Sequence, residues 1–231
     1  MLKEKIIPKA KELGFDLIGF AEYQNLDKEI ERLKIWLENN YEAGMEYMKK
    51  NLDKKKDAKL ILESCKSVIS LGMNYYIDEK IEETNVFGKV SRYAWCKDYH
   101  LIIWEKLDEL INYIKIYFPN FEAKSYVDTG PVMDKVWAIK AGLGWQGKHT
   151  NIISRKIGSW FFIATIFTNQ EFSGYDSPQE DFCGNCTACI DACPTNAIVD
   201  NYIVDSNKCI SYLTIENKKE IPNGFIGKFN N

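Results

Sequence analysis

Four cysteines within eleven residues constrain this chain more than any other feature of its sequence. The run reads Cys183-Gly-Asn-Cys186-Thr-Ala-Cys189-Ile-Asp-Ala-Cys193-Pro194, with two-residue gaps, then a three-residue gap, then proline. This is the spacing of bacterial ferredoxins, in which the first three cysteines bind one iron–sulfur cluster and the fourth binds another. Structural zinc is the alternative, but zinc ribbons normally separate their two Cys-x-x-Cys pairs by a longer spacer. The spacing therefore favours iron–sulfur clusters over zinc.

Length and composition predict a folded protein with one large domain and a small module. The chain has 231 residues, of which 45% are hydrophobic and 13% aromatic, enough to bury a core. A net charge of -3 argues against a surface coated in positive charge for bulk nucleic-acid binding, although a local basic patch is still possible. We expect neither a secretory signal nor a membrane span. The cysteine usage indicates a reducing, cytoplasmic location.

The hydrophobic pattern predicts helices and strands in irregular alternation, which places the chain in the α+β class. Helices are expected near residues 2–13, 26–39 and 103–117, and strands near residues 15–20, 67–76, 123–127, 151–154 and 159–168. The third helix is expected to turn an apolar stripe to the core, made of Ile103, Leu107, Leu110, Ile114 and Tyr117. Residues 169–181 are polar and suit a linker, so we divide the chain into residues 1–172 and 173–231. No G-x-G-x-x-G motif occurs at a strand-to-helix turn, so a dinucleotide-binding fold is unsupported.

Asp128 is the first candidate for chemistry. It ends a predicted strand at the turn Asp128-Thr-Gly-Pro131, and Pro131 suits the first turn of a following helix. A carboxylate there can act on a ligand at the edge of the sheet, or it can simply cap the helix N-terminus. The glycine-rich loop at residues 142–149 is equally open, because it is either a tight turn or an anion cradle with Lys148 and His149.

A lysine-rich segment at residues 44–60 has two interpretations, a solvated helix face or an anion-binding surface. Its lysines are Lys49, Lys50, Lys54, Lys55, Lys56 and Lys59. His100 and His149 are the two histidines of the chain, and neither has a cysteine or histidine partner at metal-binding spacing. Catalytic zinc held by protein ligands is therefore not expected.

Several further stretches carry longer motifs. They are Val90-Ser-Arg-Tyr-Ala, Asp98-Tyr-His100, Val127-Asp-Thr-Gly-Pro-Val, Ala141-Gly-Leu-Gly-Trp-Gln-Gly-Lys-His149 and Val204-Asp-Ser-Asn-Lys-Cys209-Ile-Ser-Tyr-Leu-Thr-Ile-Glu216. Together with the cysteine run they resemble one family, the epoxyqueuosine reductases, over the chain from about residue 13 to its end. The resemblance implies a nitroreductase-like, cobalamin-binding domain, related to that of reductive dehalogenases, followed by a partial bacterial-ferredoxin-like 4Fe-4S module.

The resemblance also implies a reaction. Members of the family reduce epoxyqueuosine to queuosine in the tRNA anticodon loop, with electrons passing through two 4Fe-4S clusters to cobalamin, carried as cob(II)alamin. A flavodoxin or ferredoxin is the expected electron donor, and we expect a monomer without membrane attachment. The family's proton donor falls on Asp128, and a carboxylic acid that donates near neutral pH needs a raised pKa, as burial against a cofactor would provide. The positions expected to contact cobalamin are Lys55, where many members have arginine, Ser91, Lys148, His149 and Ile152.

The family pattern assigns the cysteines to two clusters. Cys183, Cys186 and Cys189 would serve the first cluster, while Cys193 and Cys209 would serve the second. Members carry three more cysteines in a later motif, so we expect both ligand sets to be incomplete here, as in a fragment, a split version or a chain completed from outside. Two other functions remain open at this stage, a truncated electron-transfer iron–sulfur protein and a cobalamin-dependent, reductive dehalogenase-like enzyme.

Overall fold

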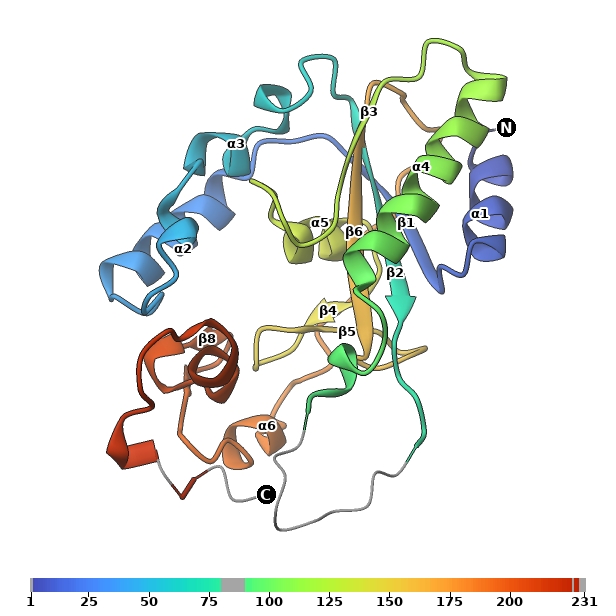
Figure 1. Cartoon of the computed structure of the whole chain (residues 1–231). Helices are drawn as coiled ribbons and strands as arrows, with labels where there is room; N and C mark the ends of the chain where they lie inside the picture. Colours follow the sequence, from blue (N-terminus) through green and yellow to red (C-terminus); the bar gives the residue numbers. More distant parts are fainter. Residues whose placement is uncertain (1, 80–89, 226, 229–231) are drawn as a thin grey trace.

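The computed structural model describes residues 2–79, 90–225 and 227–228 and shows a mixed helix and sheet architecture (Figure 1). A four-stranded antiparallel sheet lies at its centre, with strands in the order β1-β2-β6-β3. These strands are β1 (Leu17–Glu22), β2 (Ser67–Asn74), β3 (Ala123–Tyr126) and β6 (Phe161–Thr168). The sequence-based expectation of strands at these four places is confirmed.

The two central strands follow directly from the sequence. β2 and β6 are buried along most of their length, because apolar and small residues occupy both of their faces. The first strand begins two residues later than predicted. Gly14 adopts a left-handed φ of 91° and ends the preceding helix, and Phe15 fills the core instead of starting the strand.

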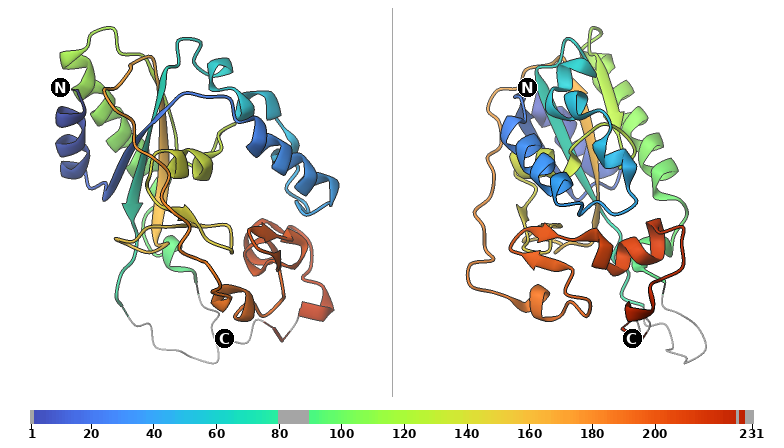
Figure 2. Two further views of the ribbon diagram at one scale, coloured as in Figure 1. Left: turned by 180° about the vertical axis from the view of Figure 1, so that it is seen from behind. Right: turned by 90° about the vertical axis from the view of Figure 1, so that its left-hand side faces the viewer.

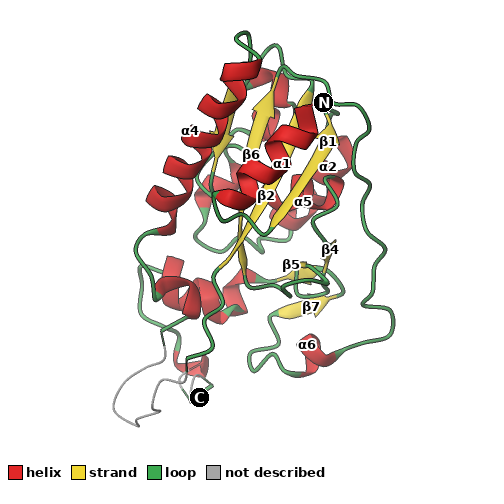
Figure 3. Cartoon of the chain, turned by 90° about the vertical axis from the view of Figure 1, so that its right-hand side faces the viewer, coloured by secondary structure: helices red, strands yellow, loops and turns green. Residues whose placement is uncertain are grey.

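Helices cover both faces of the sheet (Figure 3). One face carries α1 (Leu2–Glu12) and α4 (Tyr99–Tyr117), while α5 (Asp134–Lys140) packs on the other, beyond which lie α2 (Asp27–Glu38) and α3 (Leu52–Lys56). The apolar stripe predicted for α4 is confirmed by its buried residues Ile103, Leu107, Leu110 and Ile114. Tyr117 was expected in the same stripe but is 43% exposed, and its ring packs at the surface against Tyr113 and the Lys5 ammonium.

The helix after Asp128 begins later than the sequence suggested. α5 starts at Asp134, and its N-cap residue is Met133. Pro131 therefore lies in the connecting turn and not in the first turn of the helix. The prediction was wrong because proline fixes a φ angle that suits a helix start, but it does not determine where the hydrogen bonds of the helix begin.

The cysteine-containing part lies below the sheet, next to the short hairpin of β4 (Trp145–Gln146) and β5 (Ile152–Ile153) (Figure 2). It contains α6 (Ala188–Asp191) and the hairpin of β7 (Ile198–Asp200) and β8 (Ile203–Val204). Two 3₁₀ helices, η4 (Ser206–Lys208) and η6 (Asn223–Phe225), and a π-helix, η5 (Tyr212–Glu216), complete it. The preceding linker packs on the sheet domain, since Phe172 is buried in its core and the Phe20 N–H donates to Asp176 Oδ2 at 2.8 Å. The boundary after residue 172 stays a prediction.

Candidate active site and iron–sulfur module

Asp128 lies directly after β3, at the edge of the sheet. Its φ is 56°, a left-handed conformation that aspartate and asparagine tolerate better than most residues. Its Oδ2 accepts a hydrogen bond from the Tyr99 hydroxyl at 2.9 Å. Because Met133 is the N-cap of α5, the interpretation of Asp128 as a helix cap is wrong. Its side chain is 72% exposed, so the fold presents this carboxylate to a ligand instead of burying it.

The first residues of α4 surround Asp128 on one side. Asp98 caps the helix, and its Oδ1 accepts from the His100 N–H at 2.9 Å and lies 2.8 Å from His100 Nδ1. The Tyr99 ring stacks on Phe162 with centroids 3.9 Å apart. His100 Nε2 is buried, lies 3.9 Å from Asp128 Oδ2, and has no hydrogen-bond partner among the described residues. Sequence reasoning noted the Asp98-Tyr-His100 motif but gave it no role.

Electrostatic effects connect Asp128 to the cysteine-containing part. Burial raises the pKa of Tyr99, and the negative charge of Asp128 raises it further. Burial also raises the pKa of Tyr47, with additional effects from Glu216 and Asp128. The pKa of Lys135 is lowered by loss of solvation, against the attraction of groups that include Asp128 and Cys209. Groups from both parts of the chain therefore share one electrostatic neighbourhood.

A small cavity lies in this region. Its volume is ≈ 120 Å³, and Lys135, at its polar end, donates from Nζ to Asn151 Oδ1 at 2.8 Å. The rest of its wall mixes apolar and aromatic side chains with two hydroxyls and is formed by Tyr75, Ile152, Ser159, Phe161 and Ile163. Ile152, predicted to contact a cofactor, thus lines a cavity next to Lys135. His149 is close by, because its Nδ1 accepts from the Asn151 N–H at 3.1 Å, and burial lowers the pKa of its imidazole.

Lys148 and Lys55, both predicted to contact cobalamin, point their ammonium groups at backbone carbonyls. Lys148 is buried, and its Nζ donates to the carbonyl oxygens of Gly184 at 2.8 Å and Cys186 at 2.9 Å. Lys55 is also buried, its Nζ donates to the carbonyl oxygens of Tyr47 at 3.2 Å and Met48 at 2.8 Å, and burial lowers its pKa. Both ammonium groups therefore hold backbone loops in place.

Other lysines of the 44–60 segment pair with acids at the surface. Lys49 lies 2.7 Å from Glu42 and Lys56 lies 2.6 Å from Asp27. Ser91, the last predicted contact position, is exposed directly before the turn η3 (Arg92–Ala94). The structure thus places Ile152 in the cavity wall and His149 against Asn151, another residue of that wall, and it places Lys55 and Ser91 on other loops.

The cysteine-containing part is attached to the sheet domain at a second place. Trp36 Nε1 donates to the Val204 carbonyl at 2.7 Å, and the Gly44 N–H donates to the Tyr212 hydroxyl at 2.9 Å. Gly44 cannot be replaced without disturbing this contact, since an added Cβ would lie 2.6 Å from the Tyr212 oxygen. These contacts flank Cys209 in the sequence and fix its segment against α2 and the residues that follow it.

The thiols suit iron–sulfur clusters better than zinc. No three His, Cys, Asp or Glu side chains in the described part of the chain converge closely enough to hold one metal ion. Tetrahedral zinc needs four ligands around one point, whereas each cysteine of a 4Fe-4S cluster binds a separate iron. Cys193 Sγ accepts a hydrogen bond from the Ala197 N–H at 3.2 Å. Burial opposes ionisation of the Cys193 thiol, but hydrogen bonds of this kind outweigh it and leave the pKa of the thiol below its ordinary value. The five cysteines of the predicted cluster sites are all free and partly or fully exposed: Cys183, Cys186, Cys189, Cys193 and Cys209.

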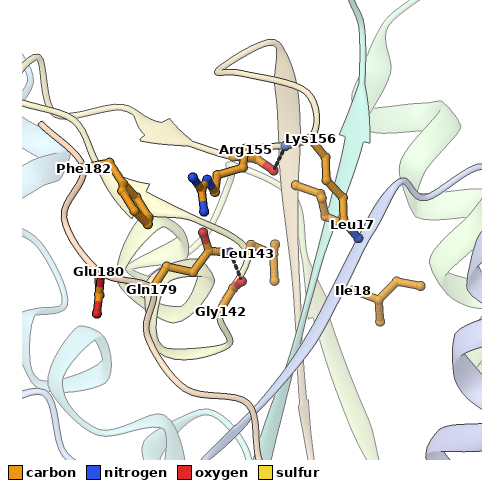
Figure 4. A pocket seen from close by; sticks show the side chains of 10 residues that line it. Leu17, Ile18, Gly142, Leu143, Arg155, Lys156, Gln179, Glu180 and Phe182 are labelled. Atoms are coloured by element: carbon orange, nitrogen blue, oxygen red, sulfur yellow. Dashed lines mark hydrogen bonds between the residues drawn. The ribbon is translucent and has the colours of Figure 1, made fainter.

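A larger cavity of ≈ 440 Å³ lies away from Asp128 (Figure 4). It is bounded by the start of β1, the loop at Gly142, the turn after β5 and residues 179–182. Arg155 lies over the Phe182 ring at 4.4 Å, and Gln179 Nε2 donates to the Gly142 carbonyl at 2.7 Å. Neither Asp128 nor His100 lines it, so its size alone does not make it the reaction site.

Comparison with known proteins identifies the family. The family model described as "Epoxyqueuosine reductase QueG, DUF1730" matches residues 55–129, and the "4Fe-4S double cluster binding domain" matches residues 182–230. The epoxyqueuosine reductase of Cellulophaga algicola is 47% identical over 221 residues, covering 96% of this chain and 71% of that protein. This chain belongs to the epoxyqueuosine reductase family. The members are oxidoreductases, and the cysteine run of this chain is part of a 4Fe-4S binding domain.

Solved structures agree with this family. An epoxyqueuosine reductase crystallised with an epoxyqueuosine-modified tRNA-Tyr stem loop has a TM-score of 0.91 and 35% identity, covering 99% of this chain and 60% of that chain. This chain thus spans less than two thirds of that structure's length. A catabolic reductive dehalogenase has a TM-score of 0.57 and 16% identity over 90% of this chain and 28% of its own, a likeness that shows the fold alone. Every described helix is too short or too polar to cross a membrane.

Proposed function

We propose that this chain reduces epoxyqueuosine in the tRNA anticodon loop to queuosine, with Asp128 as the proton donor. The observation that carries the proposal is an exposed carboxylate at the end of β3, held at 2.9 Å by the Tyr99 hydroxyl. An epoxide oxygen leaves poorly as an alkoxide, so its departure requires a proton. The family membership points to this substrate and not to a halogenated one.

The residues near Asp128 fit a cofactor that reaches from the sheet domain to the cysteine-containing part. Drug-sized ligands occupy pockets of about 300–1,000 Å³, so the ≈ 120 Å³ cavity would take only one edge of cobalamin. Its mixed wall of apolar and aromatic side chains and hydroxyls, with the polar ends of Lys135 and Asn151, suits a ring system that carries amide groups. Bound cobalamin would supply electrons to the epoxide carbon, and the 4Fe-4S clusters would supply electrons to cobalamin.

The predicted contact residues then divide into two roles. We assign direct contact with cobalamin to Ser91, His149 and Ile152. Lys148 and Lys55 act at one remove, because their ammonium groups hold the loops at residues 184–186 and 47–48. The sheet domain is nitroreductase-like in this proposal, the electron donor is a flavodoxin or ferredoxin, and the chain works as a monomer in the cytoplasm.

The substitution Asp128→Asn tests the proton-donor role. Asparagine keeps the size of the side chain and tolerates the left-handed φ, but it has no carboxyl proton to give. We expect turnover of an epoxyqueuosine-containing stem loop by the reconstituted chain to fall by about 100-fold or more, with unchanged melting temperature. Asp108→Asn, on the exposed face of α4, is the matched control. Wild-type turnover by the D128N variant would refute the assignment.

A separate measurement tests the cofactor. Reconstituted protein is incubated with cobalamin and gel filtered, and iron and cobalt are quantified in the protein peak. Cobalt that co-elutes with the chain supports the site. Iron without retained cobalt would refute the cobalamin proposal and favour an electron-transfer role for this chain.

A further inference from the structure

The reaction proposed above needs more protons than Asp128 can hold. Converting an epoxide into an alkene breaks both C–O bonds and releases the oxygen as water, which takes up two electrons and two protons. A single carboxyl group carries one proton, so it must be reloaded before the second C–O bond breaks. This inference rests on the proposed function and concerns the group that supplies the second proton.

His100 occupies the position from which Asp128 can be reloaded. Its Nε2 is buried, lacks a hydrogen-bond partner in the described structure, and lies 3.9 Å from Asp128 Oδ2. Buried polar nitrogens are normally hydrogen-bonded, so one that faces a carboxylate without a partner calls for a functional explanation. The gap closes with a small rotation of either side chain or through one bridging water.

The other side of the imidazole is fixed. His100 Nδ1 lies 2.8 Å from Asp98 Oδ1, and hydrogen bonds from His100 lower the pKa of the Asp98 carboxyl, so Asp98 is ionised and accepts the Nδ1 proton. This bond leaves Nε2 as the nitrogen that exchanges a proton with Asp128. The Asp98 side chain is 56% exposed and that of His100 22%, so the pair is open to solvent at the Asp98 end.

We propose that His100 is a positioning residue that acts through Asp128 and returns a proton to it between the two C–O cleavages. The Nε2–H bond of the imidazolium breaks, an O–H bond forms at Asp128 Oδ2, and the imidazole is left neutral with Nδ1–H on Asp98. No electrons move in this step. Asp128 then protonates the hydroxyl, which leaves as water, and solvent reprotonates His100 before the next turnover.

Carboxylates and aromatic rings surround His100. On its own element, Asp98 contacts it directly, while the rings of Tyr99 and Trp104 lie at centroid distances of 4.0 and 5.7 Å. Asp128 faces it from the loop after β3. Beyond Asp128 lie the carboxyl of Asp134 and the ammonium of Lys135, whose opposite charges both act on this loop. The two charged groups nearest to the His100 imidazole are therefore both carboxylates.

The pH profile of His100→Gln separates proton supply from mere packing. Histidine changes charge between about pH 5 and 8, so the kcat of the wild type should decline across this range as His100 loses its proton. In H100Q we expect kcat at pH 6 to be about 10-fold or more lower, the decline to be absent, and KM to be unchanged. If His100 only supports the helix end, H100Q would lower the rate by the same factor at every pH, which would overturn the inference. Glu105→Gln, exposed on the same helix, is the control and should follow the wild type.

A titration that does not depend on turnover provides the second readout. The chain has two histidines, so the NMR signals of His100 are identified with a His149→Gln variant of the reconstituted protein. We expect the pH dependence of the His100 ring signals to shift in Asp128→Asn, because an anion facing Nε2 is removed. An unchanged pH dependence would overturn the pairing. If that shift occurs but the wild type does not reduce the stem loop, the proposed function fails and the pairing stands.

Discussion

Replacing Lys148 with methionine tests how the first cysteine loop is held. Lys148 comes from the loop before β5 and crosses to the cysteine run, where its Nζ donates to the carbonyl oxygens of Gly184 and Cys186. It is buried, with 6% of its surface exposed, so these two carbonyls replace the water that an ammonium group otherwise binds. Methionine keeps most of the apolar stem and removes the charge and both hydrogen bonds.

The expected effect is large but local. A hydrogen bond to a charged group contributes about 1.5–3 kcal/mol. The two carbonyls share one ammonium, and the Cys186 carbonyl belongs to an exposed residue that water can reach, so we expect about 2–4 kcal/mol for the pair. At 1.4 kcal/mol per factor of ten, this makes opening of the loop roughly 30- to 1,000-fold more favourable. Most of the remaining fold does not depend on this contact, so the melting temperature of the sheet domain should change little.

Chelator-driven loss of the reconstituted clusters measures this opening. The visible absorbance of K148M should disappear at least about 10-fold faster than that of the wild type, because iron bound by the loop is released when the loop opens. Lys156→Met removes the same charge from an exposed position and should match the wild type. Equal rates for K148M and wild type would show that the Lys148 hydrogen bonds do not hold the cysteine loop.

Three further predictions concern the sheet domain. Burial raises the pKa of Asp134 to about 6, above its value in the unfolded chain. Ionisation of Asp134 therefore destabilises the folded protein as pH rises from about 4 to 6. The variant Asp134→Asn should have a melting temperature about 2–6 °C above the wild type at pH values above 6, and nearly the same one below pH 4. Gly19→Ala should cost about 3 kcal/mol or more and reduce soluble yield, because its Cβ would lie 1.9 Å from the Ala141 carbonyl oxygen. Burial raises the pKa of Cys65 to about 11, so at pH 8 iodoacetamide should label the exposed Cys96 and spare Cys65 until the protein unfolds, as read by mass spectrometry.

Each of these predictions has a control and a contrary outcome. A D134N melting temperature that exceeds the wild-type value equally at all pH values would mean that packing, not ionisation, is responsible. Gly224→Ala should be neutral, since an added Cβ there meets open space. Rapid labelling of Cys65 in the folded protein would show that its environment opens on the time scale of the reaction.

The elements of the sheet domain could be predicted because each carries its own pattern. Apolar runs mark β2 and β6, and the spacing of the buried residues marks α4. Two predictions about these elements were wrong because the sequence pattern does not show the surroundings of a residue. Pro131 has a backbone angle that suits the start of a helix, but α5 begins three residues later. Tyr117 continues the helical spacing of α4, but it lies at the surface and not in the core.

The site was predictable only in part, because several of its contacts join distant segments. The position of Asp128 after a strand could be read from the sequence, but the choice between cap and ligand-facing carboxylate needed the true start of α5. Lys148 was predicted to contact the cofactor, and the sequence did not show that its ammonium donates to carbonyl oxygens beyond β6, in the cysteine run. His100 lacked a partner at metal-binding spacing, and nothing in the sequence shows that Asp128 faces it across 3.9 Å.

The two attachments between the parts of the chain explain how proton and electron sites can be kept in register. Lys148 fixes the loop that carries Cys186, while the hydrogen bond between Gly44 and Tyr212 fixes the segment that carries Cys209. Each attachment holds a different cysteine segment, so weakening one should leave the other in place. Positioning within fractions of an ångström strongly affects reaction rates. A fixed Cys209 segment therefore matters most near Asp128, where a proton must reach the epoxide oxygen while electrons reach the carbon that this oxygen leaves.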